Sequence, residues 1–291
     1  MTDPFGPLVS VEWLTEHLGD EDLAVVDCRW SLDTGPARGD YDSAHIPNAV
    51  FVDLDADLAA PPSTSAGRHP LPTPEAFAAT MRRCGIGDDT RVVAYDDAGG
   101  VIAARLWWML DVTGRPAAVL DGGLAAWGGP LEAATPTPAP GAFSVRAWPP
   151  ERCISAAELV GSLGPDTVVL DARSPDRYVN GSAVDPRPGH VPTARNAPAG
   201  ANLSDGRFRN PDELATHYGR LGVDDEAAVV AYCGSGVTAC ADLLGMRLAG
   251  LPDARLFVGS WSAWGADPDL PVEEGDPAGE VGVVDDVEER S

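Results

Sequence analysis

The sequence predicts an α/β protein of two tandem domains, each a mostly parallel sheet flanked by helices. Three observations carry this prediction. The halves of the 291-residue chain repeat the same segments in the same order, each half alternates short apolar runs with helical patterns, and a proline-rich segment separates them. A chain of this length can bury two cores, and strands that alternate with helices are typical of parallel sheets covered on both faces.

The internal repeat decides the domain organisation, because self-similarity of this kind marks duplicated structural units. In each half, an apolar run that ends in Asp is followed by a segment with His and Pro, then by a second apolar run. A final segment rich in Gly and Trp ends each repeat. The alignment places Asp96 where the second half has Cys233. The matched segments are 23–29 with 168–173, 44–49 with 189–197, 91–96 with 228–233, and 120–128 with 257–265.

Secondary structure follows from the apolar patterns within each repeat. Short β-prone runs predict buried strands, and longer amphipathic stretches predict the helices between them. The strands are expected at 24–27, 92–95, 118–120, 168–171, 229–232 and 256–257. The helices are expected at 11–18, 74–84, 102–110, 156–163, 211–221 and 238–248.

Composition marks the domain boundary and the end of the second domain. Residues 134–141 are rich in proline and lie at the midpoint of the repeat, which is typical of a linker. The end of the chain is acidic and Gly-rich without a regular period, which favours a solvated tail. We therefore expect an N-terminal domain at 1–134, a linker at 135–152, a C-terminal domain at 153–272 and a tail at 273–291.

The net charge of −25 limits the possible partners. Nucleic acids and anionic membranes both repel such a surface, so neither is expected as a partner. The chain has no lysine, a trait that either a high-GC genome or adaptation to salt would produce. No apolar run reaches membrane-spanning length, and the first residues lack the pattern of a secretory signal. A cytoplasmic monomer or weak oligomer is the expectation.

The cysteines indicate neither a disulfide framework nor a metal centre. Their number is odd, their spacing is irregular and no CxxC pair occurs, whereas zinc sites and dithiol redox sites need closely spaced pairs. One special thiol in a reducing compartment fits this pattern better. No metal or organic cofactor is expected. The cysteines are Cys28, Cys84, Cys153, Cys233 and Cys240.

Cys233 stands where a predicted strand ends and a short Gly-containing loop leads into a predicted helix. Loop amides and a helix N-terminus favour negative charge, so a thiol placed there is readily a nucleophilic thiolate. A buried, inert cysteine behind a tight turn is the alternative, because free cysteines are usually buried. Cys233 alone leaves both interpretations open.

The residues Cys233-Gly-Ser-Gly-Val-Thr238 resemble the active-site loop of the rhodanese-like sulfurtransferases, in particular the 3-mercaptopyruvate branch. The resemblance extends over both halves of the repeat and implies paired rhodanese-like domains. It also implies sulfur transfer from 3-mercaptopyruvate to a thiol or cyanide through a persulfide on Cys233. Because Asp96 occupies the matching position, the first domain is expected to be non-catalytic and to form one wall of a site between the domains.

The resemblance assigns roles to the residues that follow the cysteine. The amides of Gly234, Gly236, Val237 and Thr238 would cradle the negative charge of the persulfide. The two glycines suit a backbone that curls with its N–H groups inward. Ser235 would relay a proton or hold the leaving enolate. Thr238 either donates to the sulfur or caps the next helix, and the cap is the simpler interpretation.

Arginine and acid–histidine pairs complete the site by resemblance. Arg177 and Arg187 match arginines that grip the substrate carboxylate, although their spacing is one residue longer in this chain. A guanidinium group suits such a bidentate clasp. His69 and Asp55 of the first half resemble the pair that completes the proton relay, although the loop between them is longer here.

Other functions remain as alternatives. Thiosulfate sulfurtransferases of the family usually carry basic residues in the loop, whereas this loop is uncharged, so thiosulfate is the second choice of donor. Cysteine phosphatases and arsenate reductases need an arginine at the end of the loop, where this chain has Ala239. A non-enzymatic sulfur carrier or scaffold is the most remote alternative, because the cysteine is present.

Overall fold

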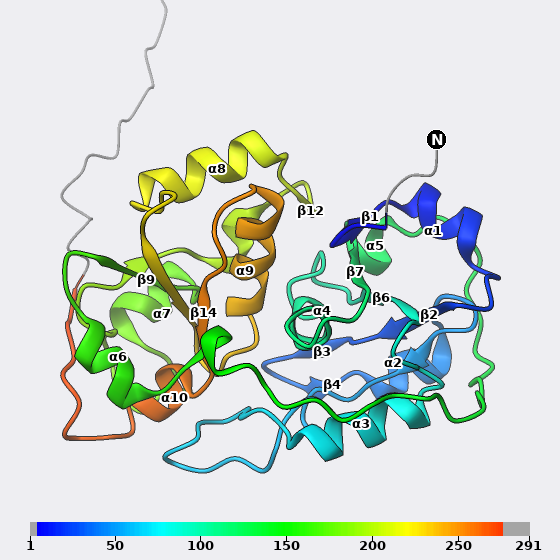
Figure 1. The fold of residues 1–291 in the computed structure, drawn as a ribbon, viewed down its shortest axis with the longest axis horizontal. Coiled ribbons are helices and arrows are strands. Elements are labelled where there is room, and N and C mark those ends of the chain that lie inside the picture. Colours follow the sequence, from blue (N-terminus) through cyan, green and yellow to red (C-terminus); the bar gives the residue numbers. More distant parts are fainter. Residues whose placement is uncertain (1–4, 276–291) are drawn as a thin grey trace, which may run out of the picture.

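Two parallel sheets, one in each half of the chain, form the framework of the computed structural model, which describes residues 5–275 (Figure 1). The strand orders of the two sheets superimpose element by element, as a duplicated domain requires. The first sheet runs β1 (Leu8–Val9), β7 (Ala117–Leu120), β6 (Arg91–Tyr95), β2 (Leu23–Asp27), β5 (Val50–Phe51). The second runs β8 (Cys153–Ile154), β14 (Arg255–Phe257), β13 (Ala228–Tyr232), β9 (Thr167–Asp171), β10 (Arg195–Asn196).

Helices connect the strands and cover the sheets, and two short hairpins branch from the connections (Figure 1). The helices of the first half are α1 (Val11–His17), α2 (Arg38–Ser43), α3 (Pro74–Arg83), α4 (Ala104–Asp111) and α5 (Gly123–Ala126). Those of the second half are α6 (Ala156–Ser162), α7 (Pro175–Asn180), α8 (Pro211–Arg220), α9 (Ala239–Leu248) and α10 (Ser260–Trp264). The hairpins are β3 (Trp30–Ser31) with β4 (Gly35–Pro36) and β11 (Leu203–Ser204) with β12 (Arg207–Phe208).

The predicted α/β fold class is confirmed, and every predicted strand and helix is present within two residues of its expected ends. Helix α6 and helix α8 begin with capping boxes at Ser155 and Asn210, as their sequences favour. The elements that went unpredicted are two-residue edge strands and short helices, which are too brief to show a period. No helix among residues 5–275 is both long and apolar enough to cross a membrane.

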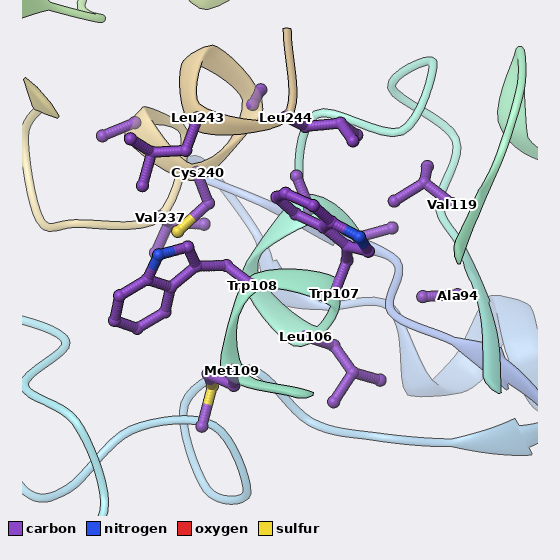
Figure 2. Packing of buried hydrophobic residues seen from close by; sticks show 14 of the residues in the cluster. Ala94, Leu106, Trp107, Trp108, Met109, Val119, Val237, Cys240, Leu243 and Leu244 are labelled. Carbon is purple, nitrogen blue, oxygen red and sulfur yellow. The ribbon is translucent and has the colours of Figure 1, made fainter. Parts of the chain in front are cut away.

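The two halves share one buried core, because helices α4 and α9 pack against each other across their boundary (Figure 1). Trp107 and Trp108 of α4 are fully buried in the same cluster as Cys240 and Leu244 of α9 (Figure 2). Burial of large aromatic side chains is among the strongest apolar contributions to stability. The Cys233 loop, which precedes α9, is therefore held against the first half.

The acidic end of the chain lies mostly outside the described residues. Glu273, predicted to begin the tail, still contacts the second domain, because its backbone pairs with that of His190 and its carboxylate accepts from the Thr193 amide at 2.7 Å. Glu132 pairs with His45 in the same way in the first half. The exact domain boundaries stay a prediction.

Asp96 stands in the first half at the position that Cys233 has in the second, and its side chain lies inside the loop that follows it. Its carboxylate is fully buried and accepts four backbone N–H bonds of 2.7 to 2.8 Å, from Ala98, Gly100, Ile102 and Ala103. Helix α4 begins at Ala104, two residues later than expected. The amides that precede it bind this side chain instead.

Replacing Asp96 by Ala should destabilise the fold by about 3 kcal/mol or more, because buried amides lose their acceptor. Sulfur loading of Cys233 should persist in the folded fraction. Chemical denaturation and mass spectrometry of the loaded protein would measure the two effects. A stable variant that no longer loads sulfur would show that the first half takes part in the chemistry at this position.

Candidate active site

Cys233 lies at the C-terminal end of β13, the central strand of the second sheet, where open α/β sheets place their ligands. Its side chain is buried, and the Gly236 amide donates a hydrogen bond of 3.1 Å to Sγ. Two hydrogen bonds fix the backbone of Cys233: its N–H donates to Ser260 Oγ at 3.2 Å, and its carbonyl accepts from the backbone N–H of Trp261 at 2.9 Å. The sulfur therefore faces a fixed amide donor that stabilises negative charge.

The tight bend of the loop depends on Gly236. Its φ is +79°, and a Cβ at this position would lie 2.6 Å from the carbonyl oxygen of Val258, so only glycine fits. Val237 turns into the apolar cluster beside α4 (Figure 2). Thr238 occupies the N-cap position of α9, but its side chain makes no capping hydrogen bond. The expected side-chain cap is wrong, because Thr238 already has helical dihedral angles.

A hydrogen-bonded relay from the first half reaches the loop. Ser235 Oγ lies 2.8 Å from His69 Nδ1, and His69 Nε2 lies 2.9 Å from Asp55 Oδ1. Trp30 orients both Asp55 and His69. Its Nε1 donates to the Asp55 carboxylate at 3.3 Å, and its ring packs edge to face against the His69 imidazole. The structure thus brings together four residues that the sequence places up to 180 positions apart: Cys233, Ser235, His69 and Asp55.

Burial keeps the relay histidine neutral. It lowers the pKa of His69 below the ordinary value and outweighs the hydrogen bond with Asp55, which acts in the opposite direction. In the neutral ring, Nε2 donates to the Asp55 carboxylate, which leaves Nδ1 free to accept from the Ser235 hydroxyl. The arrangement can accept a proton from Ser235 and return it.

Arg177 reaches the loop from α7, whereas Arg187 does not. Nη2 of Arg177 would lie 2.7 Å from a Cβ placed on Gly234, and its guanidinium also forms a two-bond ion pair with Asp185 at 2.6 and 3.0 Å. Arg187 Nη2 instead donates to the carbonyls of Asp267 and Leu270 at 2.8 and 3.0 Å. A carboxylate-binding role for Arg187 would therefore fall to Nε and Nη1, because Nη2 is already engaged.

Sequence reasoning missed two arginines that the first half brings to the loop. Arg105 of α4 is fully buried, and its Nη1 donates to the carbonyl of Gly236 at 2.9 Å. Arg68 precedes the relay histidine, and its Nη2 would lie 2.9 Å from a Cβ on Gly234. An arginine within the apolar pattern of a buried helix was the available signal for Arg105, because such a charge needs a polar partner.

Burial disfavours the thiolate form of the other four cysteines. All five cysteines are free, and burial raises the pKa of Cys84 and Cys153 to about 11 and that of Cys240 to about 12. These remain thiols at neutral pH and are poor nucleophiles. Among residues 5–275, no cluster of His, Cys, Asp or Glu has the arrangement of a metal site.

Arg173 and Arg29 are structural, as their position after a buried Asp predicts. Arg173 binds Asp171 with hydrogen bonds of 2.6 to 3.0 Å, and Arg29 binds Asp27 in the same manner. These pairs fix the C-terminal ends of strands β9 and β2. Buried charges of this kind persist because they are paired.

Replacing Gly236 by Ala should reduce the rate of sulfur loading about 100-fold, because the amide donor to Sγ would move. It should also cost about 1–3 kcal/mol of stability through backbone strain. Single-turnover loading and denaturation would measure both. Gly219→Ala is the matched control, since this glycine of α8 has nothing within 4 Å of its Cβ position and a helical backbone. Normal loading by Gly236→Ala would contradict the account of the loop.

Fold and site together define a protein of two like domains, in which the second carries the buried Cys233 thiol and the first contributes His69 and Asp55, which are hydrogen-bonded to its loop. The model of the rhodanese-like domain matches residues 10–129 and 155–267, once in each half. The chain belongs to the rhodanese-like family.

Relatives within this family carry the same two-domain arrangement. The chain is 36% identical to the 3-mercaptopyruvate sulfurtransferase of Escherichia coli K12, with 91% of this chain and 97% of that protein covered. It is 33% identical to the thiosulfate/3-mercaptopyruvate sulfurtransferase 1 of Arabidopsis thaliana, over 92% of this chain and 78% of that protein. The crystal structure of SseA from Escherichia coli is similar to the whole fold, with a TM-score of 0.79, 32% identity, and 88% and 98% of the two chains covered.

Proposed function

We propose that this protein is a 3-mercaptopyruvate sulfurtransferase that carries sulfur as a persulfide on Cys233 and delivers it to a thiol or to cyanide. One observation supports this most directly: Sγ of Cys233 meets the Gly236 amide next to the Ser235–His69–Asp55 relay. Donor and acceptor are small molecules, and the chemistry needs no cofactor. A cytoplasmic monomer or weak oligomer stays part of the proposal.

In the first half-reaction, the Cys233 thiolate attacks the sulfur of 3-mercaptopyruvate. The S–S bond forms as the C–S bond breaks, and the electron pair of that bond leaves on C3 of pyruvate as an enolate. The proton of the donor thiol moves through Ser235 and His69 to C3. Pyruvate departs, and Cys233 holds a persulfide anion that the loop amides stabilise.

In the second half-reaction, the acceptor attacks the outer sulfur. The electron pair of the S–S bond returns to Cys233, and the acceptor leaves as thiocyanate or as a hydropersulfide. Because a covalent intermediate separates the two steps, ping-pong kinetics are expected. The relay has no proton to deliver to carbon in this step.

The identity of the donor is tested by comparing 3-mercaptopyruvate with thiosulfate, each with cyanide and with a thiol as acceptor. We expect 3-mercaptopyruvate to give the higher kcat/KM and thiosulfate to retain some activity. Cys233→Ser should abolish turnover of both, with Cys240→Ser as the matched control. A preference for thiosulfate would favour the alternative of a thiosulfate sulfurtransferase, and turnover by Cys233→Ser would exclude the mechanism.

Replacing His69 by Gln should separate the two donors. Loss of the relay should lower kcat with 3-mercaptopyruvate about 100-fold, because an enolate must be protonated. Thiosulfate should be affected much less, since sulfite leaves without needing a proton. Steady-state kinetics with both donors measure the ratio. An equal loss for both would mean that His69 acts on the fold of the loop and not on the proton.

A further inference from the structure

Arg68 lies in the first half at the mouth of the Cys233 loop, yet it belongs to neither the proton relay nor the loop. We propose that its guanidinium group binds the anionic end of the sulfur donor and supplies the positive charge that the loop lacks. The proposal rests on the function proposed above, and it extends to both the carboxylate of 3-mercaptopyruvate and the charged oxygens of thiosulfate.

The position of Arg68 is suited to this role. A Cβ on Gly234 would lie 2.9 Å from Nη2 of Arg68 and 2.7 Å from Nη2 of Arg177. The two guanidinium groups therefore converge on the residue directly after the nucleophile. A donor whose sulfur lies at Cys233 can place its anionic end beside this glycine.

The two arginines differ in how far their charge is compensated. Arg177 is neutralised by its two-bond ion pair with Asp185. Arg68 has no carboxylate within ion-pair distance among residues 5–275: its Nη1 donates to the carbonyl of Val184 at 2.5 Å, and its buried Nε has no partner. Asp185 attracts Arg68 through space without a direct ion pair. A half-buried cation without a directly bound anion is costly in free energy, and an anionic donor reduces that cost.

The backbone fixes Arg68 against the second half. Its N–H donates to Ser262 Oγ at 3.0 Å, and a Cβ on the preceding Gly67 would lie 2.4 Å from the carbonyl oxygen of Gly259. The φ of Gly67 is +86°, so glycine permits this close approach. The side chain consequently starts from a defined point in the first half, beside the Cys233 loop.

The electrostatic surroundings agree with an anion site. Burial, followed by the like charge of Arg177, lowers the pKa of Arg68, although an arginine remains charged at neutral pH. The residues at 234–238 carry no charge. Positive charge at the donor end therefore comes mainly from Arg68, because Asp185 already pairs with Arg177.

Arg68→Gln tests the proposal, with three donors: 3-mercaptopyruvate, thiosulfate and an uncharged dialkyl trisulfide. The Cys233 thiolate attacks a sulfur of the trisulfide and displaces an alkyl persulfide or an alkyl thiolate, so loading from this donor is measured as the alkyl-capped adduct on Cys233. We expect the KM for each anionic donor to rise about 10- to 100-fold, the range for loss of a hydrogen bond to a charged group. Loading from the trisulfide should change less than about twofold. Arg68→Lys, which keeps the charge, should recover much of the affinity for thiosulfate.

Arg207→Gln is the matched control, because Arg207 also joins the two halves, through Asp121, but lies in the β12 hairpin away from the loop. It should leave all three KM values unchanged. Unchanged anionic KM values in Arg68→Gln, or an equal loss with the trisulfide, would overturn the role of Arg68. If the wild-type protein loads sulfur from the trisulfide but from neither anionic donor, the proposed function fails independently of any variant.

Discussion

Gly236 makes hydrogen bonds both to the sulfur of Cys233 and to the other domain. Its amide donates to the sulfur of Cys233 at 3.1 Å, and its carbonyl accepts from the buried Arg105 of the first half at 2.9 Å and from the Cys240 thiol at 3.5 Å. One peptide segment therefore positions the sulfur and depends on the partner domain for its own position. A second domain without the first would lose this support and the proton relay together.

The duplicated halves use the same loop in two ways. In the first half, the Asp96 carboxylate satisfies four loop amides permanently. In the second half, the shorter Cys233 loop has a thiol at that point, and in the proposed reaction the negative charge moves from Sγ to the outer sulfur of the persulfide and back with each turnover. Asp96 shows, within this same chain, that the end of this strand and the start of the next helix form a site for a buried anion.

The sequence was sufficient for the fold, because the fold depends on local patterns: apolar runs, capping residues and the repeat. The same patterns left Cys233 open between a nucleophile and an inert buried thiol, and family resemblance favoured the nucleophile. The relay of His69 and Asp55 came from family resemblance alone, since nothing local marks a residue that acts across a domain boundary. Arg68 was missed for the same reason, whereas Arg105 had a local signal in its place within an apolar helix. The contacts of both arginines with the Cys233 loop form only when the halves dock. Arg187 hydrogen-bonds within the second half, to the carbonyls of 267 and 270.

The location of the transferred sulfur tests the central claim most directly. The chain would be treated with 3-mercaptopyruvate without an acceptor and cleaved after arginine. Because Cys233 and Cys240 fall on the same fragment, between Arg220 and Arg247, fragmentation of that peptide by tandem mass spectrometry is needed to separate them. The account predicts one additional sulfur atom on Cys233 and none on Cys240. Added sulfur on Cys240, or on no cysteine at all, would contradict it.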